Sequence, residues 1–165
     1  RPGGIEATTD PESATGFVHW PGPRATDAVD GPVPVECSPG PGEFPVGATD
    51  VRCRAEDASG NVATHRFVVT VTDVAAPEFL AWPTALDAEA TAAGTARLWW
   101  PAPKVTDRVS GTLEAQCSPA SGSDFPLGET LVSCSARDAA GNEATLLFPV
   151  RVTKAGQRAN DRIWR

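Results

Sequence analysis

Four cysteines offer the clearest chemistry in this sequence, because they form two similarly spaced pairs, Cys37 with Cys53 and Cys117 with Cys134. Such pairs favour disulfide formation in small modules, whose cores alone give only marginal stability. Zinc binding would need CxxC spacing with further Cys or His ligands, and the chain has only two His. We therefore predict one disulfide per pair and an oxidising, extracytoplasmic compartment, with zinc coordination and free thiols as the alternatives.

Acidic side chains on turns are the second source of chemistry. In the tandem arrangement inferred below, the junction between modules gathers Asp73, Asp107, Asp138 and Asn142. Carboxylate and carbonyl oxygens are the ligands that Ca²⁺ prefers in proteins. The alternative is that each Asp accepts hydrogen bonds from the backbone of its own turn. Calcium is the one cofactor that the sequence leaves open, and we expect no other.

Trp99, Trp82 and His65 are the remaining candidates for binding. Alternation along its strand points Trp99 outward, which favours packing against an edge or a neighbouring module over a ligand platform. His65 shares the inward parity of Phe67, which favours a hydrogen-bonded interior histidine over a pH-sensing or ligand-binding group. Paired carboxylates occur only on turns, and neither His belongs to a nucleophile motif. We therefore predict no catalytic residue and no enzymatic activity.

The cysteine-bearing stretch occurs twice, which sets the domain organisation. Residues 37–61 read CSPGPGEFPVGATDVRCRAEDASGN, and residues 117–142 read CSPASGSDFPLGETLVSCSARDAAGN. Repetition at a fixed period indicates two homologous modules of about eighty residues. The sequence therefore predicts modules at 1–73 and 74–154, joined by a short linker, with a tail at 155–165.

Period-two alternation predicts the strands of both modules. It places Val18 and Trp20 on one face of a strand, and Leu98 and Trp100 on the matching face of the second module. Inward-facing cysteines suggest a bridge from one sheet to the other, and the Asp-Ala-x-Gly-Asn segments are typical of hairpin turns. Short strands with frequent turn signals and no helical periodicity predict an all-β chain of two tandem immunoglobulin-like antiparallel β-sandwiches.

The combined motifs resemble the hyalin repeat, or HYR domain. Both copies carry Thr-Asp-x-x-x-Gly, Cys-Ser-Pro, Phe-Pro-x-Gly and Ala-x-Asp-Ala-x-Gly-Asn in the same order, over nearly the whole chain. The resemblance implies an immunoglobulin-related fold in extracellular adhesion and matrix-type proteins, with no catalytic residues. Many members of the family carry a second cysteine pair, whose places are filled here by Trp82 and Leu146 in module two and by His65 in module one. We expect Trp82 to be buried against Leu146.

Module one also lacks residues at its start. Module two begins with Ala76-Pro-Glu-Phe-Leu-Ala-Trp82-Pro, whereas module one has four residues before Ile5. We therefore expect module one to lack its first strand, leaving an open edge beside His65. The chain is then cut within the module, or the strand comes from a partner chain or from the tail 155–165, or the edge stays strandless.

The leading hypothesis for function is a non-catalytic extracellular structural or adhesion module, a rod-like spacer or protein-interaction unit of a larger secreted or surface protein. One alternative is a self-assembling surface filament formed by strand donation into the open edge. Another is a carbohydrate-binding accessory module that uses Trp99 and Trp82. We expect protein partners or self-association. A net charge of −7 argues against nucleic acid, and no apolar run is long enough for membrane insertion.

Overall fold

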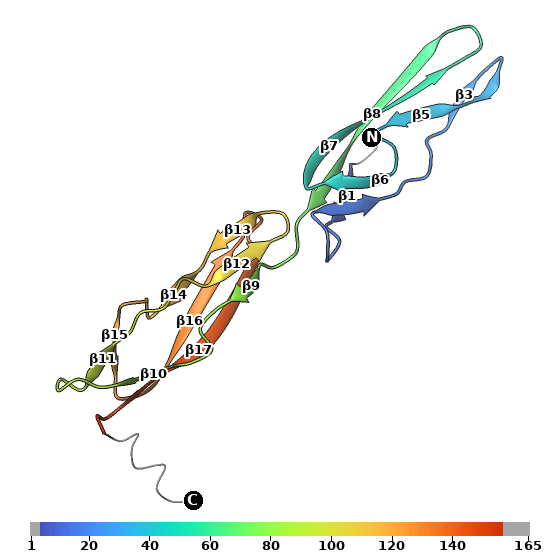
Figure 1. Ribbon diagram of the computed structural model, residues 1–165. Coiled ribbons are helices and arrows are strands. Elements are labelled where there is room, and N and C mark those ends of the chain that lie inside the picture. Colours follow the sequence, from blue (N-terminus) through green and yellow to red (C-terminus); the bar gives the residue numbers. More distant parts are fainter. Residues whose placement is uncertain (1–3, 157–165) are drawn as a thin grey trace, which may run out of the picture. The chain divides into compact units, whose positions relative to one another are not determined.

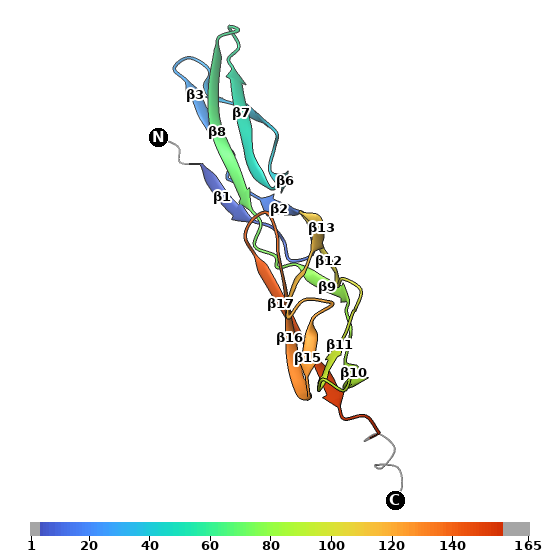
Figure 2. The same ribbon diagram turned by 90° about the vertical axis from the view of Figure 1, so that its left-hand side faces the viewer.

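The structure is a computed structural model that describes residues 4–156, and the chain divides into two compact units, Arg1–Ala75 and Ala76–Arg165. Every regular element in the described residues is a β-strand (Figures 1 and 2). The predicted all-β fold class is confirmed. Residues 4–156 contain no helix long and apolar enough to cross a membrane.

Unit 1 is built around the long hairpin of its last two strands (Figure 1). The main sheet has the order β1-β8-β7-β5, and the pairs β2-β6 and β3-β4 form two further small sheets. All pairs are antiparallel except β1 with β8. The strands are β1 (Ile5–Thr8), β2 (Thr15–Val18), β3 (Ala25–Asp27), β4 (Gly31–Val33), β5 (Val35–Ser38), β6 (Gly42–Pro45), β7 (Gly47–Glu56) and β8 (Val62–Thr72).

Unit 2 repeats this plan with one addition. Its main sheet has the order β10-β17-β16-β14, β11 pairs with β15, and a three-stranded sheet has the order β13-β12-β9. Strand β9 lies beside β12 (Figure 2), and it has no counterpart among the described strands of unit 1. The strands are β9 (Glu78–Ala81), β10 (Leu86–Glu89), β11 (Thr95–Arg97), β12 (Lys104–Asp107), β13 (Gly111–Glu114), β14 (Gln116–Ser118), β15 (Asp124–Pro126), β16 (Gly128–Arg137) and β17 (Glu143–Thr153).

Each core is centred on one tryptophan that contacts two phenylalanines. In unit 1, Trp20 is 6% exposed, as its parity predicts, and its ring centroid lies 5.8 Å from Phe44 and 5.2 Å from Phe67. Edge-on aromatic packing of this kind adds about 0.5–1.5 kcal/mol to the effect of burial alone. The same arrangement recurs in unit 2 at 6.0 and 5.4 Å, between Trp100 and the rings of Phe125 and Phe148.

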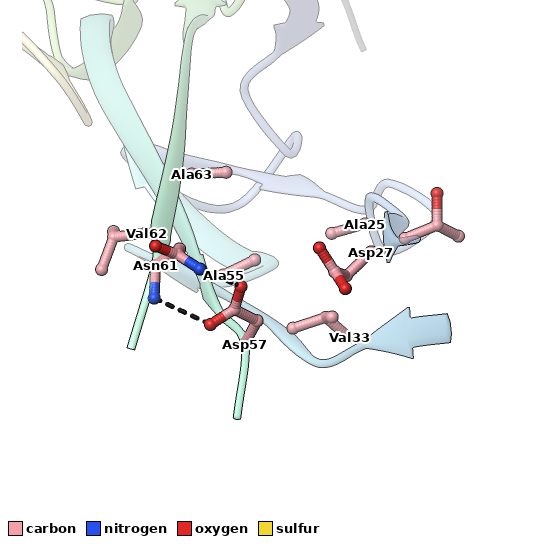
Figure 3. A pocket seen from close by; sticks show the side chains of 9 residues that line it. Ala25, Asp27, Val33, Ala55, Asp57, Asn61, Val62 and Ala63 are labelled. Carbon is pink, nitrogen blue, oxygen red and sulfur yellow. Dashed lines mark hydrogen bonds between the residues drawn. The ribbon is translucent and has the colours of Figure 1, made fainter. Parts of the chain in front are cut away.

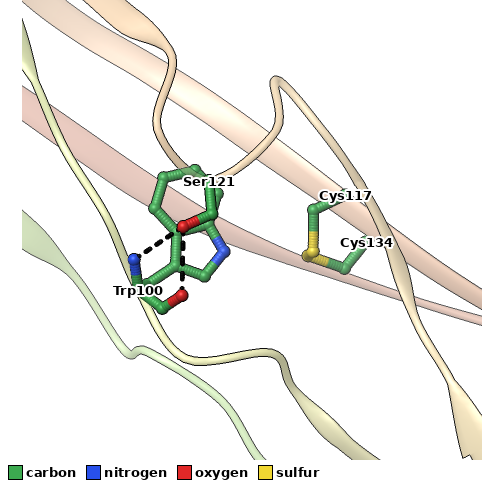
Figure 4. Close-up of a disulfide and its surroundings, with 4 residues drawn as sticks. All are labelled: Trp100, Cys117, Ser121 and Cys134. Carbon is green, nitrogen blue, oxygen red and sulfur yellow. Dashed lines mark hydrogen bonds between the residues drawn. A yellow bond between two sulfur atoms is a disulfide. The ribbon is translucent and has the colours of Figure 1, made fainter.

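Both predicted disulfides are present, but they do not cross between sheets. Cys37 on β5 lies directly opposite Cys53 on β7 in the same sheet, and Cys117 on β14 lies opposite Cys134 on β16 (Figure 4). The predicted sheet-to-sheet bridge is therefore wrong. Both side chains of a pair face inward, yet directly opposed residues of neighbouring antiparallel strands are already close enough to bond, with Cα atoms 4.0 Å apart.

Candidate functional site

The Asp-Ala-x-Gly-Asn turns connect the two strands of each long hairpin, as predicted. Asp57 accepts hydrogen bonds from the backbone amide of Asn61 at 2.8 Å and from its side-chain amide at 2.7 Å (Figure 3). Gly60 takes a φ of 85°, a left-handed conformation that favours glycine. The bonds from Asn61 hold the pKa of Asp57 below its ordinary value. This aspartate therefore has a structural role that accounts for its place in the motif.

The corresponding turn of unit 2 brings three of the four calcium candidates together. Asp138 accepts two hydrogen bonds from Asn142, both at 2.8 Å, and Asp107 accepts from the amides of Val109 and Ser110. Burial raises the pKa of Asp138, but the bonds from Asn142 and neighbouring amides outweigh it, so the net direction is downward. The carboxylates of Asp107 and Asp138 lie within 4.8 Å of one another.

The fourth calcium candidate, Asp73, belongs to unit 1. Its carboxylate accepts hydrogen bonds from the Thr9 hydroxyl at 3.4 Å and from the Ala75 amide at 3.1 Å. A further acidic group in unit 1 consists of Asp27, Asp30 and Asp57, whose oxygens lie within 4.8 Å of one another. In both units, hydrogen bonds within turns give several of these carboxylates a structural role. Calcium binding stays a prediction.

His65 is not an interior residue, which corrects our expectation. Its parity is inward as predicted, since it pairs with Cys53 across β7 and β8, but its side chain is exposed. The imidazole stacks beside Phe67 with ring centroids 6.4 Å apart. The equivalent residue of unit 2, Leu146, is partly buried and packs against the core with Phe79 of β9. Among the described strands of unit 1, none takes the place of β9. The inward-facing side of β8 is therefore exposed to solvent at His65.

Trp99 and Trp82 are both on the surface. Trp99 is 68% exposed, as its parity predicts, and its indole lies over Gly122, where an added Cβ would meet the ring nitrogen at 2.9 Å. Trp82 is 45% exposed, so the expected burial against Leu146 is wrong. The apolar residue that β9 contributes to the core is Phe79, because it lies opposite the buried Val105.

Among residues 4–156, strand β3 has an edge that is covered in its unit 2 counterpart. Within residues 4–156, β3 pairs with β4 alone, whereas the equivalent β12 pairs with β13 on one side and β9 on the other. Thr26 lies opposite Pro32, which has no N–H to donate, so this is a non-hydrogen-bonded position of the ladder. The N–H and C=O groups of Thr26 therefore face away from β4, toward the open side.

Two adjoining hollows extend along this edge. One has a volume of about 180 Å³ and the other about 140 Å³, and Ala25, Ala55 and Ala63 line both. Figure 3 shows the larger one, with Ala25, Asp27 and Val33 on one side and the end of the β7-β8 hairpin on the other. The second continues along β8 to Thr64 and His65.

The hollows occupy the position that β9 fills in unit 2. Pro23 is exposed and Ala25 is half-buried, whereas their equivalents Pro103 and Val105 are both buried. Phe79 of β9 is the direct partner of Val105 and packs against the unit 2 core. Sequence reasoning predicted an open edge beside His65 but missed Thr26 and the three alanines. An alignment of the two modules, in which Ala25 stands where module two has Val105, is the signal that could have pointed to these residues.

Comparison with known families agrees with this fold. The HYR domain family matches residues 2–71 and again 73–152. The chain belongs to the HYR domain family. It is 33% identical over 141 residues to Hyalin of Lytechinus variegatus, covering 83% of this chain and 27% of that protein. The HYR pair is also 31% identical over 147 residues to the mouse Sushi, von Willebrand factor type A, EGF and pentraxin domain-containing protein 1, covering 87% of this chain and 4% of the relative.

Solved structures of low sequence identity also align with the HYR pair. A protocadherin gammaB7 EC3-6 structure covers 92% of this chain and 49% of its own, with a TM-score of 0.42 and 14% identity. The insect immune protein hemolin covers 92% and 45%, with a TM-score of 0.36 and 10% identity. The chain spans about a quarter or less of the curated relatives named above, at 27% and 4% of their lengths.

Proposed function

We propose that this HYR pair is a non-catalytic protein-interaction unit of a larger extracellular adhesion-type protein, and that unit 1 makes contact through the open edge of β3. The carrying observation is that, within residues 4–156, β3 pairs with β4 on one side and with no strand on the other, toward which the Thr26 backbone groups are directed. Sheet edges of this kind accept extended segments from partners. The two disulfides support an oxidising, extracellular setting.

The test is an adhesion assay with the whole chain immobilised on beads. Filling the edge with Ala63→Phe is expected to reduce bead binding to cells or extracellular matrix, because the bulky ring occupies both hollows. Arg66→Phe is the matched control, since it adds the same ring to the same strand on the opposite face. Equal binding by the native chain and both variants would show that the β3 edge takes no part in adhesion.

Carbohydrate binding is the second candidate. The exposure of Trp99 and Trp82, at 68% and 45%, favours it, because stacking on sugars needs accessible rings. A glycan array probed with the native chain and with Trp99→Ala tests this function. Glycan binding that survives in the variant, or no binding by the native chain, would remove Trp99 from consideration.

A further inference from the structure

We infer that Trp99, Arg97 and Asp124 form a site in unit 2 that binds a neutral, β-linked oligosaccharide of glucose type, in which every ring hydroxyl is equatorial. This inference rests on carbohydrate binding, the second candidate function above. It deepens that function by naming the class of sugar and two polar residues beside Trp99. The site lies in a different unit from the β3 edge.

The apolar part of the site is the indole of Trp99. An added Cβ at Gly122 would meet three neighbouring atoms of the ring, Nε1 at 2.9 Å, Cδ1 at 3.4 Å and Cε2 at 3.5 Å. Because these distances are similar, Gly122 lies under the face of the ring and not at its edge. Trp99 is nevertheless 68% exposed, so its other face is open to solvent. The ring is held in place before a ligand binds, which lowers the entropy cost of stacking.

The polar part of the site is the ion pair of Arg97 and Asp124. They lie directly opposite each other on the neighbouring strands β11 and β15 (Figure 1). Nε and Nη2 of Arg97 donate to the two carboxylate oxygens of Asp124 at 3.0 and 2.7 Å. The side chains are 56% and 51% exposed, which leaves further N–H groups and oxygen lone pairs accessible. Neighbouring donors and acceptors match the vicinal hydroxyls of a sugar.

The apolar and polar parts face the same way. Leu98 and Trp100 pack toward the core of unit 2, so the alternate residues Arg97 and Trp99 face outward. The chain stays extended past β11, because the Leu98 amide donates to the Ser123 carbonyl at 3.3 Å and the Leu98 carbonyl accepts from Gly122 at 2.7 Å. Residues two apart in an extended chain are separated by about 6–7 Å. A sugar stacked on the indole therefore brings its hydroxyls, or those of the next sugar ring, to the ion pair.

The surroundings of the indole favour a sugar over a peptide. The Leu98 backbone is bonded to the loop at 121–123, and the Trp100 amide and carbonyl are both bonded to the Ser121 hydroxyl, so this side offers no free ladder positions to an incoming strand. The loop residues are small and polar, which makes the indole a single flat apolar surface with a polar rim. A pyranose chair with equatorial hydroxyls has the same character, with C–H groups on its faces and hydroxyls around its edge.

The charge of the site selects against acidic sugars. The hydrogen bond from Arg97 holds the pKa of Asp124 below its ordinary value, so the carboxylate is ionised at neutral pH. The ion pair therefore has no net charge. A carboxylate or sulfate on the sugar would gain from Arg97 but be repelled by Asp124, whereas neutral hydroxyls can donate to one and accept from the other.

The equivalent positions of unit 1 do not form this site. Phe17 and His19 stand where unit 2 has Arg97 and Trp99, and Phe17 lies opposite Glu43. The loop between the Cys-Ser-Pro and Phe-Pro motifs is one residue longer in unit 2, and this is the loop that carries Gly122. Trp99 is exposed although strands β9 to β17 are all in place. We therefore expect sugar binding in unit 2 alone.

The experiment titrates the whole chain with cellohexaose, a neutral β-1,4-linked hexamer of glucose, and follows binding by ¹H–¹⁵N NMR. Saturable binding is expected, with a dissociation constant on the order of 1 mM. The Trp99 Nε1–H and Arg97 Nε–H signals should shift with the same constant. β-1,4-Mannohexaose, which has an axial 2-hydroxyl, and the glucose hexamer oxidised to carboxylates at C6 should each bind at least about 5-fold more weakly.

Variants of the chain test the location. Trp99→Ala should weaken binding about 10-fold or more, and Phe17→Ala is its matched control, since Phe17 is an aromatic of similar exposure in unit 1, at 64%. Arg97→Gln should weaken binding about 3- to 10-fold. Arg151→Gln is the control for it, because Arg151 forms an exposed ion pair with Glu129 in the same unit and should leave binding unchanged. All four side chains are exposed, so unaltered melting temperatures should show that the variants fold.

Three results would overturn the inference: no saturable binding at about 10 mM cellohexaose, binding that Trp99→Ala does not weaken, or binding that Arg97→Gln does not weaken. A Trp99 signal that shifts with chain concentration in the absence of sugar would overturn it too, because the indole would then contact a second copy.

The outcomes of this inference and of the proposed functions are separable. If cellohexaose fails to bind while the glycan array shows another glycan whose binding Trp99→Ala abolishes, carbohydrate binding stands and only this inference fails. If cellohexaose binds as expected but beads carrying Ala63→Phe adhere like native ones, the sugar site stands and the adhesive role of the β3 edge fails.

Discussion

Replacing Phe79 with alanine measures how much strand β9 contributes to the stability of unit 2. Phe79 is half-buried, lies opposite Val105, which is 2% exposed, and packs against the core. Truncating a fully buried phenylalanine costs about 3–5 kcal/mol. Because Phe79 keeps part of its surface in solvent, we expect Phe79→Ala to lower the free energy of unfolding of unit 2 by about 2 kcal/mol.

Urea denaturation followed by residue-resolved amide NMR measures this loss, because the amides of β16 and β17 report unit 2. With an m-value of about 1 kcal/mol/M for a small domain, the midpoint should fall by about 2 M. Leu80→Ala is the matched control on the same strand, since Leu80 is 59% exposed and should change the midpoint by less than about 0.5 M. Equal effects of the two substitutions would refute the view that β9 is held by Phe79.

Three further outcomes are expected. Replacing both cysteines of unit 2, which are 17 residues apart, with alanine should cost about 3 kcal/mol of unfolding free energy in urea titrations. Ser121→Ala should cost about 1–2 kcal/mol by the same assay, because the hydroxyl both accepts from and donates to the Trp100 backbone (Figure 4). Asp57 should titrate below its ordinary pKa of 3.8, and Asn61→Ala should raise that pKa. The stabilisation is then present above the ordinary value and lost as pH falls through the lowered one, which ¹³C NMR titration checks.

The parts of the fold that depend on local pattern could be predicted from the sequence. Alternation correctly placed Val18, Trp20 and Trp100 in the cores, because side chains of a strand alternate between faces whatever the neighbouring strands are. The hairpin turns were also predictable, since the Asp, Gly and Asn of each turn bond within a few residues. Cysteine spacing gave the correct pairs because each of the two sequence copies carries one similarly spaced pair.

The sequence pattern could not give what depends on neighbouring strands. His65 has the parity of a core residue, yet it is exposed because no described strand covers it. Trp82 has the size and hydrophobicity of a core residue, but Phe79 is the residue of β9 that packs against the core. The cysteines face inward, but only the strand order shows that Cys37 and Cys53 share a sheet. Alternation along a strand predicts which face of the sheet a side chain lies on, but the order of the strands decides which residues cover that face.

Comparison of the two HYR units shows which features are shared and which belong to one unit only. The units share the disulfide, the aromatic trio and the Asp-Asn turn, and these features recur with nearly the same geometry. Features common to both units therefore account for folding and cannot explain a role specific to one. The units differ where Ala25 replaces Val105 and where β9 has no described counterpart. Within residues 4–156, the edge of β3 leaves accessible the equivalent of a surface that is buried in unit 2, so the proposed interaction of unit 1 is tested at that edge.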